Sequence, residues 1–233
     1  MISVFIPCYN EEQRIEKNIL HIYSLLLSLK RPFELVIVDD GSTDSTPALA
    51  KNFTKKYPHL LYQRYDPGPS RRENLGKALR TANGGIVAFM DLDLSADISY
   101  FPHLITSIEK GNDIAIGSRY KGLHAKREFG RKIISVFYNA FMRFYFHSII
   151  ADHQCGFKAF RKDKLIPLLD VMEYDAHFTR GWFWDVELLV RAQRFNYKID
   201  EFSVPWSFAK QSSFNIRREL KMLPYVLRLR FRL

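Results

Sequence analysis

Three apolar runs in this chain each end in a cluster of polar residues. Residues 2–6, 34–38 and 85–90 are the apolar runs, and the clusters that follow occupy residues 7–12, 39–46 and 91–93. Short apolar runs bounded by turn residues predict buried strands, and helical patterns separate them here. Alternating strands and helices favour a parallel sheet, in which ligands collect beyond the carboxyl ends of the strands. The three polar clusters should therefore line one crevice.

Asp91 and Asp93 are the most informative of these polar residues. Two carboxylates at the end of a buried strand are costly unless a cation meets them. Mg²⁺ and Mn²⁺ prefer such oxygen ligands, and they often keep waters and phosphates as their other ligands. An isolated Asp-x-Asp also fits a plain polar turn. Because two further polar clusters occupy equivalent positions, we favour a site for Mg²⁺ or Mn²⁺.

The motifs resemble those of glycosyltransferase family 2, which has the GT-A fold. The resemblance rests on residues 6–12, 38–44 and 91–93 in this order. Further along, residues 117–120, 131–135, 154–158 and 183–189 are similar to the polyprenyl-phosphate hexosyltransferases. These enzymes are the dolichyl-phosphate mannose synthases and the dolichyl-phosphate glucosyltransferases. The likeness covers roughly residues 1–208.

The expected fold class is α/β. The resemblance implies a GT-A (Rossmann-like), mostly parallel sheet flanked by helices, with amphipathic helices on the acceptor side and at the C-terminus. We expect a catalytic domain over residues 1–208, with a nucleotide-sugar half (1–120) and an acceptor half (121–208). Residues 209–233 form a basic, amphipathic membrane-surface segment in this division. A chain of 233 residues suits one compact domain.

The resemblance also implies roles at the donor end. The candidate nucleotide-binding residues are Pro7, Tyr9, Glu11, Asp39 and Asp40. Carboxylates suit ribose hydroxyls and base N–H groups because they accept hydrogen bonds. Pro7 could instead only shape its turn, and Asp40 could be a turn residue. Asp93, with Asp91 beside it, would hold the ion that offsets charge on the leaving diphosphate.

The implied acceptor is a polyprenyl (dolichyl-type) phosphate. Arg119, Arg131 and Ser135 match acceptor-phosphate positions, so Arg119 and Arg131 join Asp91 and Asp93 as catalytic candidates. Guanidinium groups bind phosphate oxygens bidentately. Arg131 could also be one of several surface basic residues. The family implies inversion and a β-linked product. We favour GDP-mannose as the donor, and UDP-glucose is the alternative.

Four more residues are expected to line the site: Asp152, Gln154, Asp185 and Glu187. Asp185 also fits the cap of a helix that begins near residue 183, and Glu187 fits its first turn. In family members that use hydroxyl acceptors, an acidic residue near this place serves as the base. A glycan or protein hydroxyl acceptor, with Asp185 or Glu187 as base, therefore remains an alternative.

The net charge of +10 predicts anionic partners. The basic residues concentrate after position 119 and no RNA-binding motif is present, so we expect a membrane surface as the partner and no nucleic acid. Residues 133–150 and 214–233 mix aromatic, aliphatic and basic side chains, as interfacial helices do. For residues 133–150, packing on the sheet is an equal alternative. Pro224 should break or kink the second segment.

The expected location is the cytoplasmic face of a membrane, as a peripheral protein. No stretch reaches the roughly 18 apolar residues of a spanning helix, and the chain opens on a strand without a signal peptide. Cys8 and Cys155 are expected to be free thiols of a reducing compartment. Whether a membrane-spanning partner exists is left open by the sequence.

Overall fold

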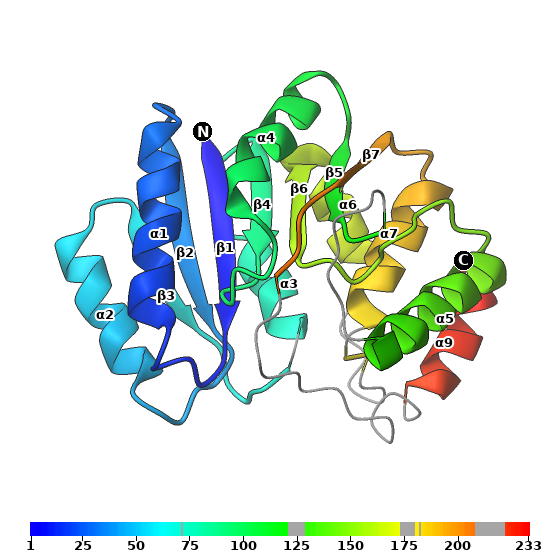
Figure 1. Cartoon of the computed structure of the whole chain (residues 1–233), viewed down its shortest axis with the longest axis horizontal. Helices are drawn as coiled ribbons and strands as arrows, with labels where there is room; N and C mark the ends of the chain where they lie inside the picture. The colour runs from blue at the N-terminus through cyan, green and yellow to red at the C-terminus, as the bar shows by residue number, and fades with distance from the viewer. Residues whose placement is uncertain (71, 121–128, 173–179, 182, 208–221) are drawn as a thin grey trace.

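Strands and helices alternate in the computed structural model (Figure 1). The structure describes every residue except 71, 121–128, 173–179, 182 and 208–221, and it does not describe the side chains of residues 129–135. The strands are β1 (Ile2–Cys8), β2 (Phe33–Asp39), β3 (Leu60–Arg64), β4 (Ile86–Met90), β5 (Ile114–Ser118), β6 (Phe157–Arg161) and β7 (Ile199–Ser203). The three strands predicted from the sequence match β1, β2 and β4.

All seven strands form one sheet in the order β3-β2-β1-β4-β6-β5-β7. Strands β1 to β4 pair in parallel, as do β5 and β7, whereas β6 runs antiparallel to both of its neighbours. The mostly parallel α/β sheet is therefore confirmed. Because β6 is reversed, its first residue, Phe157, pairs with Met90 at the carboxyl end of β4.

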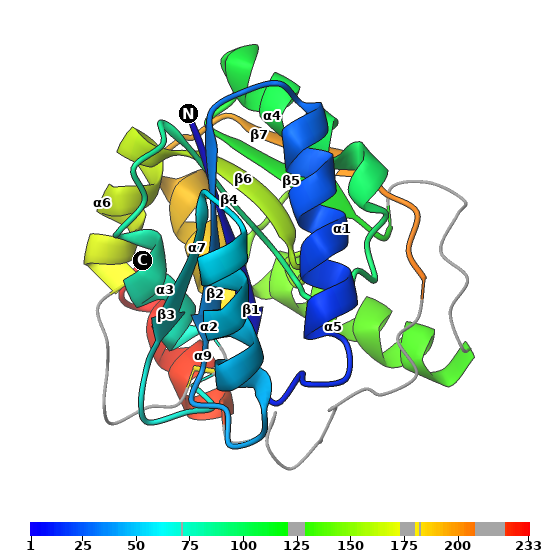
Figure 2. The same ribbon diagram turned by 90° about the vertical axis from the view of Figure 1, so that its left-hand side faces the viewer.

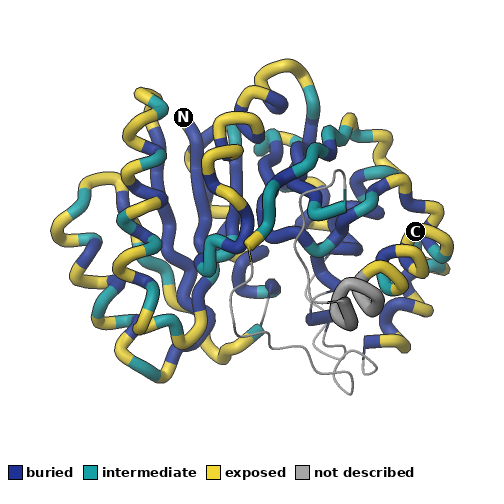
Figure 3. Tube along the Cα trace, viewed as in Figure 1, coloured by how far each residue is buried: buried dark blue, intermediate teal, exposed yellow. Residues whose placement is uncertain are grey.

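Helices cover both faces of the sheet (Figure 2). The described helices are α1 (Ile15–Ser28), α2 (Thr46–Lys56), α3 (Glu73–Leu79), the short 3₁₀ helix η1 (Ile98–Tyr100), α4 (Phe101–Glu109), α5 (Phe129–Phe146), α6 (Lys162–Met172), α7 (Phe183–Arg194) and α9 (Leu223–Arg230). Helices α1, α2 and α4 pack on one face, and α3, α6 and α7 pack on the other. The five inner strands β2, β1, β4, β6 and β5 are almost entirely buried, whereas the edge strands β3 and β7 are only partly buried (Figure 3).

Amphipathic spacing explains this layering. In α1, Ile15, Ile19, Ile22 and Leu26 are fully buried on one face of the helix. Residues three, four and seven apart lie on the same face of a helix, so this spacing directs one stripe into the core. Strand β2 instead carries a continuous apolar run because helices cover it on both sides.

Helices α5 and α9 lie beside α7 at one end of the molecule, where they share a third apolar cluster (Figure 1). Met142 and Phe146 of α5 pack there against Tyr225, Val226 and Leu229 of α9. The described side chains of α5 in this cluster therefore pack against other helices. Helix α5 ends at Phe146, so residues 147–150 of the predicted segment 133–150 lie beyond the helix. Pro224 lies in the first turn of α9, where proline is tolerated, and so marks the helix start.

Large apolar side chains are exposed on α5 and α9 and on the residues that directly follow these helices. Phe144 is 80% exposed and Phe231 is 88% exposed, and Phe137, Phe141, Ile149, Leu223 and Leu227 are exposed as well. We call these seven residues the α5–α9 patch. None of the helices in the described part of the chain is long and apolar enough to cross a bilayer.

Candidate active site

The predicted polar clusters meet at one edge of the sheet. Cys8 pairs with Asp39 at the ends of β1 and β2, and the Asp40 N–H donates to the carbonyl of Cys8 over 2.9 Å. The loops after the two strands are also tied together, because the N–H of Asn10 donates to Ser42 Oγ. Parallel neighbours bring these loops side by side, as the sequence analysis expected.

Asp39 is fully buried and has three protein donors. Its Oδ1 accepts from the Ser42 N–H at 2.8 Å, and its Oδ2 accepts from the Tyr62 hydroxyl at 2.6 Å. Arg64 pairs with the same Oδ2 at 3.3 Å. Burial and the hydrogen bond to Asp39 raise the pKa of Tyr62. The sequence analysis did not anticipate Tyr62 and Arg64 of β3 as partners of Asp39. Together with Ser42 they fix the position of the Asp39 carboxylate.

Asp40 holds the segment that leads into α3. Its Oδ1 accepts from Ser70 Oγ at 2.8 Å and from Asn74 Nδ2 at 2.7 Å. The backbone of Gly68 lies directly against the backbone of Asp40, because an added Cβ on Gly68 would lie 1.6 Å from the carbonyl oxygen of Asp40. Asp40 thus fits the structural role that the sequence left open.

The first polar cluster faces the same edge. Pro7 is half-buried at the end of β1, whereas Tyr9 is exposed. The Glu11 carboxylate lies 2.7 Å from Arg14 Nε. Burial raises the pKa of Glu11, Arg14 opposes this, and the charges of Asp93 and Asp91 raise it further. Glu11 therefore lies within electrostatic reach of both carboxylates after β4.

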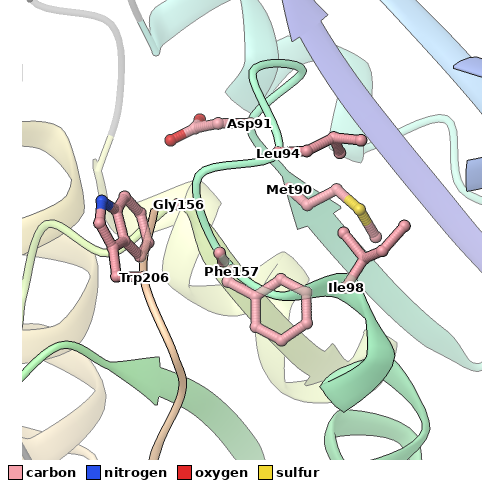
Figure 4. A pocket seen from close by; sticks show the side chains of 8 residues that line it. Met90, Asp91, Leu94, Ile98, Gly156, Phe157 and Trp206 are labelled. Atoms are coloured by element: carbon pink, nitrogen blue, oxygen red, sulfur yellow. The ribbon is translucent and has the colours of Figure 1, made fainter. Parts of the chain in front are cut away.

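Asp91 lies at the rim of a small, mostly apolar hollow (Figure 4). The hollow is lined by Met90, Leu94, Ala96, Ile98, Gly156, Phe157 and Trp206. The Asp91 N–H donates to the carbonyl of Gly156 over 3.0 Å. A Cβ on Gly156 would lie 1.9 Å from Asp91 Oδ2, so only glycine leaves room for this carboxylate.

A divalent ion fits the residues at this edge. Asp91 and Asp93 follow β4 directly, and Asp93 Oδ1 accepts the Ser95 N–H at 3.0 Å. Carboxylate oxygens are the ligands that Mg²⁺ and Mn²⁺ prefer. Within the described ranges, no group of three or more His, Cys, Asp or Glu side chains converges as a cation site. An ion at Asp91 and Asp93 would therefore need further oxygen ligands, such as phosphates and waters.

Arg72 is the site residue that the sequence analysis missed. It precedes α3, and its side chain is 2% exposed. Its Nη2 lies 2.9 Å from Asp91 Oδ1, and its Nε lies 3.0 Å from Asp185 Oδ2. No motif distinguishes this arginine from its neighbours in the sequence. An acidic strand end with no basic residue near it was the only hint that a cation had to come from elsewhere.

Asp185 is buried between two cations. Lys158 Nζ lies 2.7 Å from Asp185 Oδ1, opposite the contact with Arg72. Burial by itself raises the pKa of Asp185, but Lys158 and Arg72 together outweigh burial and lower it. An ionised carboxylate that two cations already hold is poorly suited to take a proton from an acceptor.

Glu187 is fully buried in a second group of charges. Its carboxylate accepts from Arg180 at 3.2 Å, from Arg191 at 2.8 Å and from the Tyr225 hydroxyl at 2.6 Å. Arg180 also forms a bidentate ion pair with the carboxylate of Glu73. These contacts join the starts of α3 and α7 to α9, so the Glu187 carboxylate takes part in the packing of these helices.

Arg119 and Asp152 form a buried pair after β5. Arg119 Nε and Nη2 each lie 2.6 Å from an oxygen of Asp152, and the Arg119 N–H donates to Asp152 as well. Burial works against the charge of Arg119, but Asp152 raises its pKa. The guanidinium also lies 5.1 Å from the centre of the Trp206 ring, which lines the hollow at Asp91. Asp152 thus orients Arg119 beside this hollow.

The remaining candidates are less completely described. Arg131 and Ser135 lie in the first turns of α5, but their side chains are outside the described residues. Gln154 is half-buried in the loop before β6, close to Gly156 in the chain.

Comparisons with known proteins identify the family. The model of a family described as glycosyl transferase family 2 matches residues 3–169. The glycosyltransferase AglD of Haloferax volcanii is 33% identical over 94% of this chain, which spans 35% of AglD. The dolichyl-phosphate beta-glucosyltransferase ALG5A of Trichomonas vaginalis is 30% identical over 95% of this chain, which spans 70% of that relative. The dolichol-phosphate mannosyltransferase of Pyrococcus furiosus is 37% identical over 58% of this chain, which spans 38% of it.

Two solved structures share the fold. Glucosyl-3-phosphoglycerate synthase from Mycobacterium tuberculosis, in complex with Mn²⁺, UDP and phosphoglyceric acid, has a TM-score of 0.67 and 19% identity over 97% of this chain and 76% of its own. Mannosyltransferase PcManGT from Pyrobaculum calidifontis, in complex with GDP-Man and Mn²⁺, has a TM-score of 0.66 and 19% identity over 97% of this chain and 64% of its own.

Proposed function

The chain belongs to glycosyltransferase family 2, and we propose that it transfers a hexose from a nucleotide sugar to the phosphate of a polyprenyl lipid. The proposal rests on one observation: carboxylates that could hold a metal ion and an arginine that could bind a phosphate lie at the same edge of the sheet. Asp91 and Asp93 end β4, and Arg119 follows β5 and stacks on Trp206, which lines the same hollow as Asp91. Relatives named for dolichyl-phosphate sugar transfer support the lipid acceptor.

Asp91 and Asp93 would hold Mg²⁺ or Mn²⁺, whose charge offsets that of the leaving diphosphate. Arg119, oriented by Asp152, would bind the acceptor phosphate together with Arg131 and Ser135. A phosphate monoester has a second pKa of about 6, so it is largely dianionic at neutral pH and needs no strong base. The buried, paired states of Asp185 and Glu187 are consistent with this. Direct displacement by the phosphate would invert the anomeric carbon and give a β-linked product.

Two donors have support from different observations. GDP-mannose is favoured by the motif that contains Arg119, Arg131 and Ser135. Glucose as the sugar, and hence UDP-glucose as the donor, is supported by relatives named as dolichyl-phosphate beta-glucosyltransferases, among them two that match 95% and 99% of this chain at 30% identity. The test is to incubate the protein with Mn²⁺, a short polyprenyl phosphate and either donor, and to detect sugar phospholipid by mass spectrometry. Slow donor hydrolysis without any lipid product would instead point to a hydroxyl acceptor.

Arg131→Ala should impair transfer far more than donor binding. The acceptor phosphate would lose one guanidinium, and a charge-assisted hydrogen bond is worth about 1.5–3 kcal/mol. We therefore expect transfer to fall on the order of 10- to 100-fold, with UDP or GDP affinity unchanged. Isothermal titration calorimetry in the presence of Mn²⁺ measures the affinity for UDP or GDP. Arg194→Ala, which removes an exposed arginine of α7, is the matched control. Equal losses in transfer and nucleotide affinity would assign Arg131 to the donor side.

We further propose that the α5–α9 patch places the enzyme on a membrane, at the cytoplasmic face. Its aromatic and aliphatic side chains are accompanied by exposed Arg143, Arg228 and Arg232. Interfacial helices combine these two features, and each basic residue near an anionic leaflet adds about 1 kcal/mol. The patch would bring the acceptor end of the enzyme to the surface where a polyprenyl phosphate is embedded.

Phe144→Glu should weaken binding to vesicles that contain anionic lipids. Burying one aromatic side chain contributes about 1.5–3 kcal/mol, so the expected loss in partitioning is at least tenfold. Sedimentation with vesicles measures it. Leu27→Glu is the control, because Leu27 is 53% exposed on α1 at the far side of the molecule (Figure 1). If both variants bind vesicles like the unaltered protein, the α5–α9 patch is not the contact surface.

A further inference from the structure

Arg72 is fixed on three sides. Its Nε and Nη2 contact Asp185 and Asp91, and its guanidinium centre lies 5.3 Å from the centre of the Phe89 ring. A planar guanidinium that is held at two donors and across its face has little freedom to rotate. The orientation of Arg72 therefore follows from the positions of β4 and α7.

Asp185 is the anchor of this arrangement. It is 1% exposed, and it receives Lys158 on one oxygen and Arg72 on the other. The formal charges of Asp91, Arg72, Asp185 and Lys158 cancel. Removing one partner of such a buried group leaves an uncompensated charge, which is far more costly than the intact pairing.

We propose that Arg72 is the positioning residue of the metal-site carboxylate Asp91, and that Asp185 acts through Arg72. Arg72 holds Oδ1 of Asp91, while Oδ2 lies over Gly156 at the rim of the hollow. Arg72 also separates two carboxylates that would otherwise repel each other. The inference rests on the proposed function in one respect, namely that Asp91 and Asp93 hold a divalent ion.

This arrangement gives Asp185 a role other than that of a base. A base must have a lone pair within reach of the acceptor, and cations hold both oxygens of Asp185. The groups that orient metal ligands commonly alter metal affinity by about 10- to 100-fold when they are mutated. The effect of Asp185 should therefore be visible in the binding of the ion itself.

The test measures Mn²⁺ affinity by electron paramagnetic resonance on the full chain, in the presence of UDP and, separately, of GDP. Arg72→Gln should weaken Mn²⁺ binding by about 10- to 100-fold. Asp185→Asn should weaken it less, because Arg72 keeps its contact with Asp91. The double variant should match Arg72→Gln, because residues that act through one another are non-additive. Arg161→Gln, which removes a half-exposed arginine at the other end of β6, is the control.

Two results would overturn the inference. One is Mn²⁺ affinity in Arg72→Gln within twofold of the unaltered protein. The other is an Asp185→Asn variant that binds Mn²⁺ normally and loses transfer even at saturating Mn²⁺, as loss of a base requires. If circular dichroism shows that Arg72→Gln is unfolded, Arg72→Lys replaces it in the test. Lysine keeps the positive charge, but it cannot contact Asp91 and Asp185 through two separate nitrogens as arginine does, so Mn²⁺ binding should still weaken. The Mn²⁺ binding measurements use no lipid, so failure of the polyprenyl acceptor leaves the first of these results intact.

Discussion

Asp93→Asn should lower sugar transfer by on the order of a thousandfold. The substitution keeps the size of the side chain but removes one of the two carboxylate charges that follow β4. Metal assistance at a leaving diphosphate supplies several kcal/mol, and about 4 kcal/mol corresponds to a thousandfold in rate. The rate should be measured with saturating donor, and Mn²⁺ binding should fall in parallel.

Asp97→Asn is the matched control for this prediction. Asp97 is exposed four residues further along the same loop, where its Oδ1 accepts the Ser99 N–H at 3.0 Å and caps η1. It carries the same charge but lies outside the proposed site, so transfer should be unchanged. If Asp93→Asn retained more than a tenth of the rate, the ion would not depend on Asp93 and the proposed site would be wrong.

Gly156→Ala should abolish most transfer without unfolding the protein. The new Cβ would lie 1.9 Å from Asp91 Oδ2, and a backbone hydrogen bond ties the two residues together. Either the carboxylate or the start of β6 must move. Overpacking of this kind costs about 1–3 kcal/mol of stability. Because metal sites tolerate little displacement of a ligand, we expect transfer and Mn²⁺ affinity to fall about 100-fold or more.

Gly85→Ala separates this effect from a general cost of replacing glycine. A Cβ on Gly85 meets no atom within 4 Å, and the residue lies at the opposite end of β4. Thermal melting should show little change for Gly85→Ala and a lowered Tm for Gly156→Ala. Normal Mn²⁺ affinity in Gly156→Ala would mean that Asp91 does not contribute to the ion site.

The sequence predicted three strands of the sheet and the edge where polar residues gather, because both follow from short-range patterns. Residues 2–6, 34–38 and 85–90 are continuous apolar runs, and β1, β2 and β4 occupy them. The start of α7 at Phe183 was also predicted from its local pattern. Strand β6 was not identified, and its reversed direction depends on the pairing of Phe157 with Met90 across a long stretch of chain.

The ion pairs of the site could not be predicted for the same reason. Arg72, Lys158 and Asp185 come from three distant segments, and nothing in their local sequences distinguishes a buried, paired charge from a surface one. The sequence analysis treated Arg119 and Asp152 as separate candidates, whereas they form one pair. A charged side chain that is held by another protein group is less available to bind substrate. A list of residues that match family motifs therefore overstates the number of groups that can take part directly in the chemistry.

The reversed β6 also has a consequence for how this protein is made. Strand β4 ends at Met90, yet one of its two neighbours in the sheet is not synthesised until residues 157–161 emerge. Until then β4 is an apolar strand with one unpaired edge, which other chains can join. Domains fold progressively as the chain leaves the ribosome, and such intermediates are prone to aggregate. A fragment that stops before β6 would expose this edge permanently, and it would lack the glycine that gives Asp91 its place.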